Sequence, residues 1–227
     1  MFAVVKKELK SYLLSTTGYV FIGIFMLLFS VFFYVSIFSY QSMNFEYLFY
    51  NGATILTFVC PVLTMGMFAS ERKSGTEQLI LTSPRSITAI VLGKLIAGAI
   101  VLIITEALTF VYFGILKYFG DPSLKVALST LFGFLLLSIA YLSFGMFASS
   151  ITESQIIAYF LTIGAFLIMW FLPDMANGKL QMFSLMGSFD KFPRGLISPV
   201  SIITFVSFSV LFILLTIIVL QRRKSVK

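Results

Sequence analysis

Glu106 is the acidic residue of this sequence that is best placed for chemistry, because it lies well inside a long apolar stretch. On a helix that starts near Lys94 it would sit about 18 Å deeper, at 1.5 Å per residue. A charge in hydrocarbon is costly, so its side chain is expected to face protein or water. It could line a pathway and contact a polar or cationic cargo. Alternatively, it is a protonated carboxyl bonded to Thr105, Thr109 or a neighbouring helix.

The other residue types needed for catalysis are scarce. The chain has no histidine and one cysteine, Cys60, in an apolar context. Most metal sites and the usual general bases are therefore missing, and an intrachain disulfide is impossible. The chain also lacks the G-x-x-x-x-G-K-[ST] phosphate loop. We expect no catalytic residue, no metal and no cofactor on this chain. An intramembrane enzyme that uses Glu106 as acid or base stays an alternative, to be tested by loss of turnover in Glu106→Gln.

The elements that position these residues follow from composition. Hydrophobic residues make up 59% of the chain and charged residues 11%, and the mean hydropathy is +1.03. A soluble chain carries about 25% charged residues, so the solvent here must be lipid. Six stretches meet the requirement of about 20 predominantly apolar residues for crossing a bilayer, and each must be helical. We predict a single all-α transmembrane domain over residues 1–227, with spans at 18–39, 51–70, 88–116, 126–149, 155–172 and 199–220.

The segment 2–14 precedes the first span and has two faces. Its apolar residues fall on one side of a helical wheel and its lysines on another: Phe2, Val5, Leu9, Tyr12 and Leu13 against Lys6, Lys7 and Lys10. This pattern predicts an interfacial amphipathic helix that lies on the membrane surface. A cleaved signal peptide is the alternative, but the apolar run that follows is too long and lacks an A-x-A site.

Lysine and arginine positions predict the orientation, because cytoplasmic segments are enriched in them. With both termini inside, most of the 16 basic residues are cytoplasmic: Lys6, Lys7, Lys10, Arg72, Lys73, Arg85, Lys94, Arg222, Arg223, Lys224 and Lys227. The outer side has Lys117, Lys125, Lys179, Lys191 and Arg194. We therefore expect a multi-pass protein of the cell (inner) membrane with both termini cytoplasmic. The basic residues form no patch with interleaved aromatics, so we expect no nucleic-acid partner.

The cytoplasmic connection 71–86 has the pattern of a short helix. Ser74 and Glu77 fit a capping box, and Pro84 would end the helix. Leu79, Ile80 and Leu81 supply an apolar centre. Such a helix between two spans suits docking into a groove on a partner protein. An ordinary amphipathic loop on the bilayer is the alternative.

Several stretches resemble one family of transport proteins. They are Glu71-Arg-Lys-Ser-Gly-Thr76, Leu79-Ile-Leu-Thr-Ser-Pro84, Val91-Leu-Gly-Lys94, Ser149-Ser-Ile-Thr-Glu-Ser-Gln155 and Ser188-Phe-Asp-Lys-Phe-Pro-Arg-Gly195. The first three resemble the coupling-helix signature of ABC-2 type permeases, which are membrane subunits of ABC exporters. The resemblance is closest to the branch associated with gliding motility and copper-enzyme maturation.

The resemblance implies a division of labour between chains. A separate ABC ATPase would bind ATP and Mg and hydrolyse the ATP, and a second permease subunit would complete a homodimer or heterodimer in the lipid. Coupling to the ATPase would involve Glu71, Arg72, Ser74, Gly75, Thr76, Glu77, Leu79, Leu81, Pro84, Thr152 and Glu153. A non-catalytic membrane scaffold, or an immunity-type protein that binds a toxic peptide, remains an alternative.

The external stretch 173–198 mixes apolar residues with sparse charges: Met182, Phe183, Leu185, Met186, Phe189 and Phe192. Short helices that dip into the outer leaflet would shelter them, with breaks at Gly187 and Pro193. The resemblance implies that this region caps the outer mouth of the pathway as an extracellular gate with Phe189, Phe192, Arg194 and Gly195. A plain interfacial anchor is the alternative.

Overall fold

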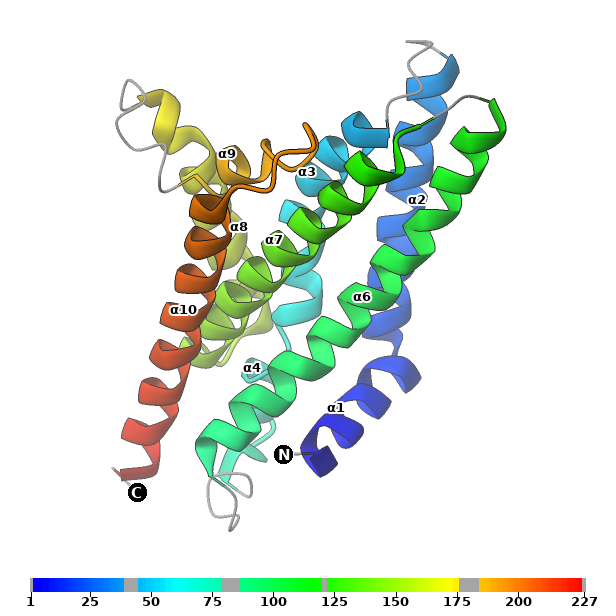
Figure 1. Ribbon diagram of the computed structural model, residues 1–227. Coiled ribbons are helices and arrows are strands. Elements are labelled where there is room, and N and C mark those ends of the chain that lie inside the picture. Colours follow the sequence, from blue (N-terminus) through cyan, green and yellow to red (C-terminus); the bar gives the residue numbers. More distant parts are fainter. Residues whose placement is uncertain (1, 39–44, 79–85, 120–121, 176–183, 226–227) are drawn as a thin grey trace.

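The computed structural model (Figure 1) describes residues 2–38, 45–78, 86–119, 122–175 and 184–225, and these residues form helices joined by turns, with no strand among them. The helices are α1 (Phe2–Leu14), α2 (Thr16–Phe38), α3 (Phe45–Thr64), α4 (Ala69–Lys73), α6 (Ile87–Phe119), α7 (Leu124–Ile151), α8 (Gln155–Met175), α9 (Leu185–Phe189) and α10 (Pro199–Ser225). The predicted bounds of the N-terminal helix, 2–14, agree with α1.

Five helical segments of the described residues are long and apolar enough to cross a membrane. They are Thr16–Ile37, Tyr47–Lys73, Ile87–Tyr118, Leu124–Ile151 and Pro199–Lys224. The predicted span 155–172 corresponds to a shorter apolar helix, Gln155–Phe171. The largest error in a predicted boundary is at the second span, which was expected to begin at 51. α3 begins at Phe45 instead, and its Leu48 and Phe49 belong to the buried core.

Two helices form the centre of the bundle. The apolar windows of α3 and α7 are 72% and 67% buried within the chain, against 22% for α2 and 17% for α10. Figure 1 shows both chain termini, α1 and α4 at one end of the bundle and α9 at the other. We call the first end the base; it consists of α1, α4, the first turns of α6 and the last turns of α7 and α10.

Packed phenylalanine rings hold the centre together. Phe21, Phe25 and Phe29 repeat every four residues on one face of α2 and are almost fully buried. Phe29 packs edge-on against Phe49 of α3 at 5.4 Å between ring centroids, and Phe49 packs against Phe134 of α7 at 5.1 Å. Offset and edge-on ring pairs add about 0.5–1.5 kcal/mol each beyond their buried area. These rings therefore join α2, α3 and α7.

The segment after α3 differs from its prediction. α4 ends at Lys73, Ser74 is its C-cap, and Gly75 follows with φ of 73°, a left-handed conformation that favours glycine. The predicted capping box at Ser74 and Glu77 is therefore wrong. Ser74 instead ends a preceding helix, because its N–H donates to the carbonyl of Ser70 at 3.0 Å. Glu77 and Gln78 are helical again, and the predicted residues Leu79, Leu81 and Pro84 lie outside the described residues.

Candidate functional site

A buried lysine joins three helices at the base. Lys94 of α6 is 2% exposed, and its Nζ lies 2.7 Å from Glu71 Oε1 of α4 and 3.1 Å from Glu8 Oε2 of α1. The ammonium also lies 5.3 Å from the centroid of the Phe68 ring. A buried charge is tolerated only when it is paired and hydrogen-bonded, and Lys94 has two carboxylates and an aromatic face. We call Lys94, Glu8 and Glu71 the Lys94 cluster.

The close approach of α1 to α6 explains why the Lys94 cluster forms. A Cβ atom at Gly93 would lie 2.8 Å from Val4 Cγ1, so glycine lets α1 pack directly against this turn of α6. Tyr12, one turn after Glu8, is buried beside the cluster. Burial first, and then the negative charges of Glu8 and Glu71, raise the pKa of Tyr12, which keeps its phenol neutral.

One hydroxyl fixes the turn between α3 and α4. Ser149 Oγ accepts hydrogen bonds from the N–H groups of Phe68 and Ala69, both at 3.0 Å, and donates to the carbonyl of Met65 at 2.9 Å. A serine hydroxyl can donate once and accept twice, so its capacity is fully used. The last turn of α7 therefore holds the start of α4, whose first N–H groups have no partner inside the helix.

Two arginines meet at the C-terminal end of α7. Arg72 of α4 pairs with Glu153 at 2.6 Å and donates to the carbonyl of Ile151 at 3.1 Å. Arg223 of α10 pairs with Glu77 at 3.0 Å and donates to the same carbonyl at 3.4 Å. Cations are favourable at a helix C-terminus, where carbonyls lack partners. These contacts connect α4, the α7–α8 junction and α10.

The two arginine pairs border a hollow of about 530 Å³ at the base. It is lined by Arg72, Gly75, Glu77, Gln78, Glu153, Arg222 and Arg223. Both signs of charge are present, and Arg222, Gln78 and the turn at Gly75 are exposed. Such a surface can dock a polar, charged segment of another protein with fixed register, because complementary charges suppress wrong pairings.

The predicted coupling residues lie in several different places at the base. Arg72, Gly75, Glu77 and Glu153 line the hollow, whereas Glu71 points inward to Lys94. Ser74 and Thr76 lie on the exposed turn, with 2.9 Å between their hydroxyl oxygens. Thr152 lies between α7 and α8, where its Oγ1 accepts from the N–H of Ser154 at 3.0 Å.

Four residues of this site were not among the predicted site residues: Glu8, Lys94, Ser149 and Arg223. Lys94 and Ser149 stood in stretches that resemble the permease family but were given no role, and Lys94 and Arg223 counted as basic residues for the orientation. The partners of Lys94 lie 86 and 23 positions earlier in the chain. One signal was present. Glu8 is the only acidic residue of the N-terminal helix, and it lies one turn before Tyr12, on the same apolar face. A carboxylate on an apolar face indicates that a cation from another helix pairs with it.

Glu106 lies on α6 and is 8% exposed, and its Oε1 has no hydrogen-bond partner among the described residues. A protonated carboxyl bonded to Thr105, Thr109 or a neighbouring helix was one interpretation of the sequence. The hydroxyls of Thr105 and Thr109 donate to the backbone carbonyls of Val101 at 2.8 Å and of Glu106 at 2.7 Å, so neither hydroxyl donates to the Glu106 side chain. A protonated carboxyl that donates to a neighbour stays a prediction. A role in a pathway stays a prediction.

The residues predicted to form a gate lie at the opposite end. Phe189 and Phe192 are fully buried, and Ser129 Oγ of α7 donates to the carbonyl of Phe192 at 2.9 Å. Arg194 is exposed and pairs with Asp190. Gly195 has φ of 76° and is exposed. Of the predicted short helices, α9 is described, and residues 176–183 lie outside the described residues.

Within the described residues, no group of three or more histidine, cysteine, aspartate or glutamate side chains could hold a metal ion.

Comparison with known protein families gave a match. The family model described as "ABC-2 family transporter protein" matches residues 2–207 of the chain. A search of curated proteins found no match.

Proposed function

The chain belongs to the ABC-2 transporter family and is a membrane permease of the ABC type, and from that premise we propose that it is the membrane-spanning subunit of an ATP-driven exporter. In this proposal a separate ABC ATPase binds ATP and Mg and hydrolyses the ATP. A second permease subunit, identical or homologous, completes the complex. The sequence resemblance described above favours the branch associated with gliding motility and copper-enzyme maturation.

The observation that carries the proposal is the charged hollow at the base. It lies beside the α4 turn and collects exposed residues from three separate parts of the chain: Gly75 and Gln78, Glu153, and Arg222. The sequence lacks a phosphate loop of its own, so ATP-driven movement needs a partner. A helix of the ATPase that enters this hollow would press on α4 and on the α7–α8 junction together.

The contacts around α4 suggest how such a push reaches the membrane helices. Ser149 ties the start of α4 to α7, Arg72 ties it to Glu153, and Glu71 ties it to Lys94 of α6. All three contacts are short, and those of Glu71 and Ser149 are at least partly buried, so a movement of α4 would shift α6 and α7 with it. Closure of the ATPases on nucleotide would then reorient the helices of the bundle as rigid bodies.

The proposed topology has six crossings, with α8 as the fifth, and both termini on the cytoplasmic side of the cell membrane. The exposed Arg222 and Lys224 at the base and the bias of Lys and Arg support this orientation. The outward faces of α8 and α10 expose large apolar side chains, such as Ile156, Phe160 and Val200. Lipid or the second permease subunit would cover these faces.

A pair of variants at Gly75 tests the proposal. Gly75→Pro cannot keep φ of 73° and loses the N–H that donates to the carbonyl of Arg72 at 3.1 Å. Gly75→Asn is the matched control, because asparagine tolerates the left-handed conformation and a Cβ there has free space. We expect Gly75→Pro to lower the ATPase affinity about tenfold, measured by copurification from solubilised membranes, and Gly75→Asn to retain it.

Two results would end the proposal. One is cargo transport by the purified chain without a copurifying ATPase. The other is ATP-driven transport by Gly75→Pro at the rate of the unaltered chain.

A further inference from the structure

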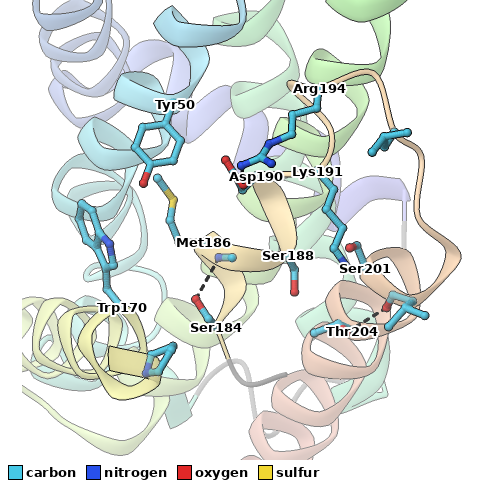
Figure 2. A pocket seen from close by; sticks show the side chains of 14 residues that line it. Tyr50, Trp170, Ser184, Met186, Ser188, Asp190, Lys191, Arg194, Ser201 and Thr204 are labelled. Atoms are coloured by element: carbon cyan, nitrogen blue, oxygen red, sulfur yellow. Dashed lines mark hydrogen bonds and ion pairs between the residues drawn. The ribbon is translucent and has the colours of Figure 1, made fainter. Parts of the chain in front are cut away.

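A second and larger hollow lies around α9, at the end of the bundle opposite the base (Figure 2). Its volume is about 880 Å³, and α3, α8, α9 and the first turns of α10 contribute to its wall. Small-molecule sites in proteins occupy about 300–1,000 Å³ and combine apolar walls with a few polar groups. The hollow has the size of such a site.

Three charged side chains line the hollow, and two of them form an ion pair with each other. Asp190, Lys191 and Arg194 line the hollow, and Asp190 pairs with Arg194. Lys191 forms no ion pair among the described residues. Because the charges of Asp190 and Arg194 neutralise each other, the ammonium of Lys191 gives the hollow a positive charge. This charge favours an anionic group in the ligand.

A buried hydroxyl on the same wall lacks a partner. Ser201 is 1% exposed, and its Oγ has no hydrogen-bond partner within the part of the chain described here. A buried polar atom without a partner is uncommon, because it has lost its hydrogen bonds to water and gained none in the protein. Ser201 belongs to the first turns of α10 and, like Lys191, lines the hollow. A ligand with acceptor oxygens could use both groups.

The other part of the wall is aromatic. Figure 2 shows Tyr50 and Trp170 on one side of α9, near Met186, and Lys191, Ser201 and Thr204 on its other side. Tyrosine and tryptophan are suited to the membrane–water interface because each has an apolar ring and a polar handle. This side of the hollow fits the apolar part of a ligand better than its charge.

From these observations we infer that the hollow around α9 binds an anionic amphiphile, with its phosphate or carboxylate group at Lys191 and Ser201 and its apolar part along Tyr50 and Trp170. The binding site is independent of the ATPase. The inference rests on the proposed function only in one respect, that an amphiphile bound there would be cargo. A neutral sugar would use the aromatic rings without needing Lys191.

Native mass spectrometry of the full-length chain in detergent tests the site. Phosphatidylglycerol is titrated as the anionic amphiphile, phosphatidylcholine as the zwitterionic control and inorganic phosphate as a competitor. We expect Lys191→Met to weaken phosphatidylglycerol binding about tenfold, the loss of one charge-assisted contact. Lys125→Met, an exposed lysine near the same end but outside the hollow, should leave it unchanged.

Ser201→Ala supplies a second measurement that a purely structural role would not reproduce. Removal of an unpartnered buried hydroxyl should leave the melting temperature equal or higher. The same variant should weaken phosphatidylglycerol binding, because the ligand loses a hydrogen-bond donor. Equal affinity for the two lipids, or an unchanged affinity in both Lys191→Met and Ser201→Ala, would overturn the inference. Displacement by inorganic phosphate alone would mean that the site takes the free anion and not an amphiphile.

The two proposals can fail separately. Loss of lipid selectivity together with normal ATPase copurification would remove the amphiphile site and leave the exporter. Selective lipid binding by a chain that recruits no ATPase would remove the exporter proposal and leave the amphiphile site.

Discussion

Lys94 has one positive charge between two carboxylates, and all three side chains are at most 16% exposed. The attraction within such a cluster offsets the loss of hydration only because the contacts are short. Lys7 lies 3.6 Å from Glu8 and adds a second, exposed cation. The cluster joins residues of α1, α4 and α6, so its loss should affect the whole base and not one helix.

We predict that Lys94→Met destabilises the chain by about 3 kcal/mol, since it leaves the largely buried Glu71 carboxylate without its cation and leaves Glu8 with only the exposed Lys7. Thermal unfolding in detergent measures the effect. Lys117→Met, an exposed lysine in the last turn of the same helix, is the control and should change little. A triple variant that adds Glu8→Gln and Glu71→Gln should recover most of the loss. An unchanged unfolding temperature in Lys94→Met alone would contradict the proposed role of the cluster.

Sequence reasoning could not assemble this cluster. It predicted Glu71 as a site residue from a motif, but the motif gives no partner for the carboxylate. The partners come from helices that meet only when the bundle folds, and Ser149 and Arg223 were missed for the same reason. A buried polar residue can be predicted from a sequence only when it is known which face of its helix packs against another helix.

At the scale of elements, α1 is the clearest case of agreement. The alternation of apolar and basic residues predicted the helix over 2–14, and that helix is observed. Its partner was not predicted, because α1 packs along α6 through Val4 and Gly93.

Gly93→Leu should therefore displace α1 from α6. A Cβ at this position would already lie 2.8 Å from Val4 Cγ1, and a leucine is larger. We expect faster cleavage after the lysines of α1 by limited trypsin digestion and a lower unfolding temperature. Adding Val4→Ala should partly restore both. Gly114→Leu, on the same helix with free space around its Cβ, is the control. Equal digestion of Gly93→Leu and Gly114→Leu would contradict this packing.

The segment after α3 shows where element prediction fails. Ser74 and Glu77 have the spacing of a capping box, yet Ser74 ends α4 because the helix starts earlier, at Ala69. That start depends on Ser149, 80 positions further along the chain from Ala69. A local pattern cannot show a cap that comes from another helix. The long apolar helices were easier, since length and hydropathy alone mark them.

At the scale of the whole molecule, the two ends of the bundle differ in character. The base has an open charged hollow together with the Lys94 cluster, whereas the α9 end has a larger hollow with aromatic and hydroxyl groups. The helices between them are joined mainly by apolar and aromatic contacts. This division agrees with a transporter that receives force at one end and meets an amphiphile at the other.

A crosslinking experiment tests the central claim, that the base receives the ATPase. Cys60, the sole cysteine, is replaced by alanine, and single cysteines are placed at exposed positions by Thr76→Cys at the base and Leu196→Cys at the α9 end. Each is labelled in membranes with a photoactivatable maleimide, and the crosslinked partners are identified by mass spectrometry. The account predicts an ABC ATPase attached to the Thr76→Cys chain and none attached to the Leu196→Cys chain. An ATPase attached only at the α9 end would contradict it.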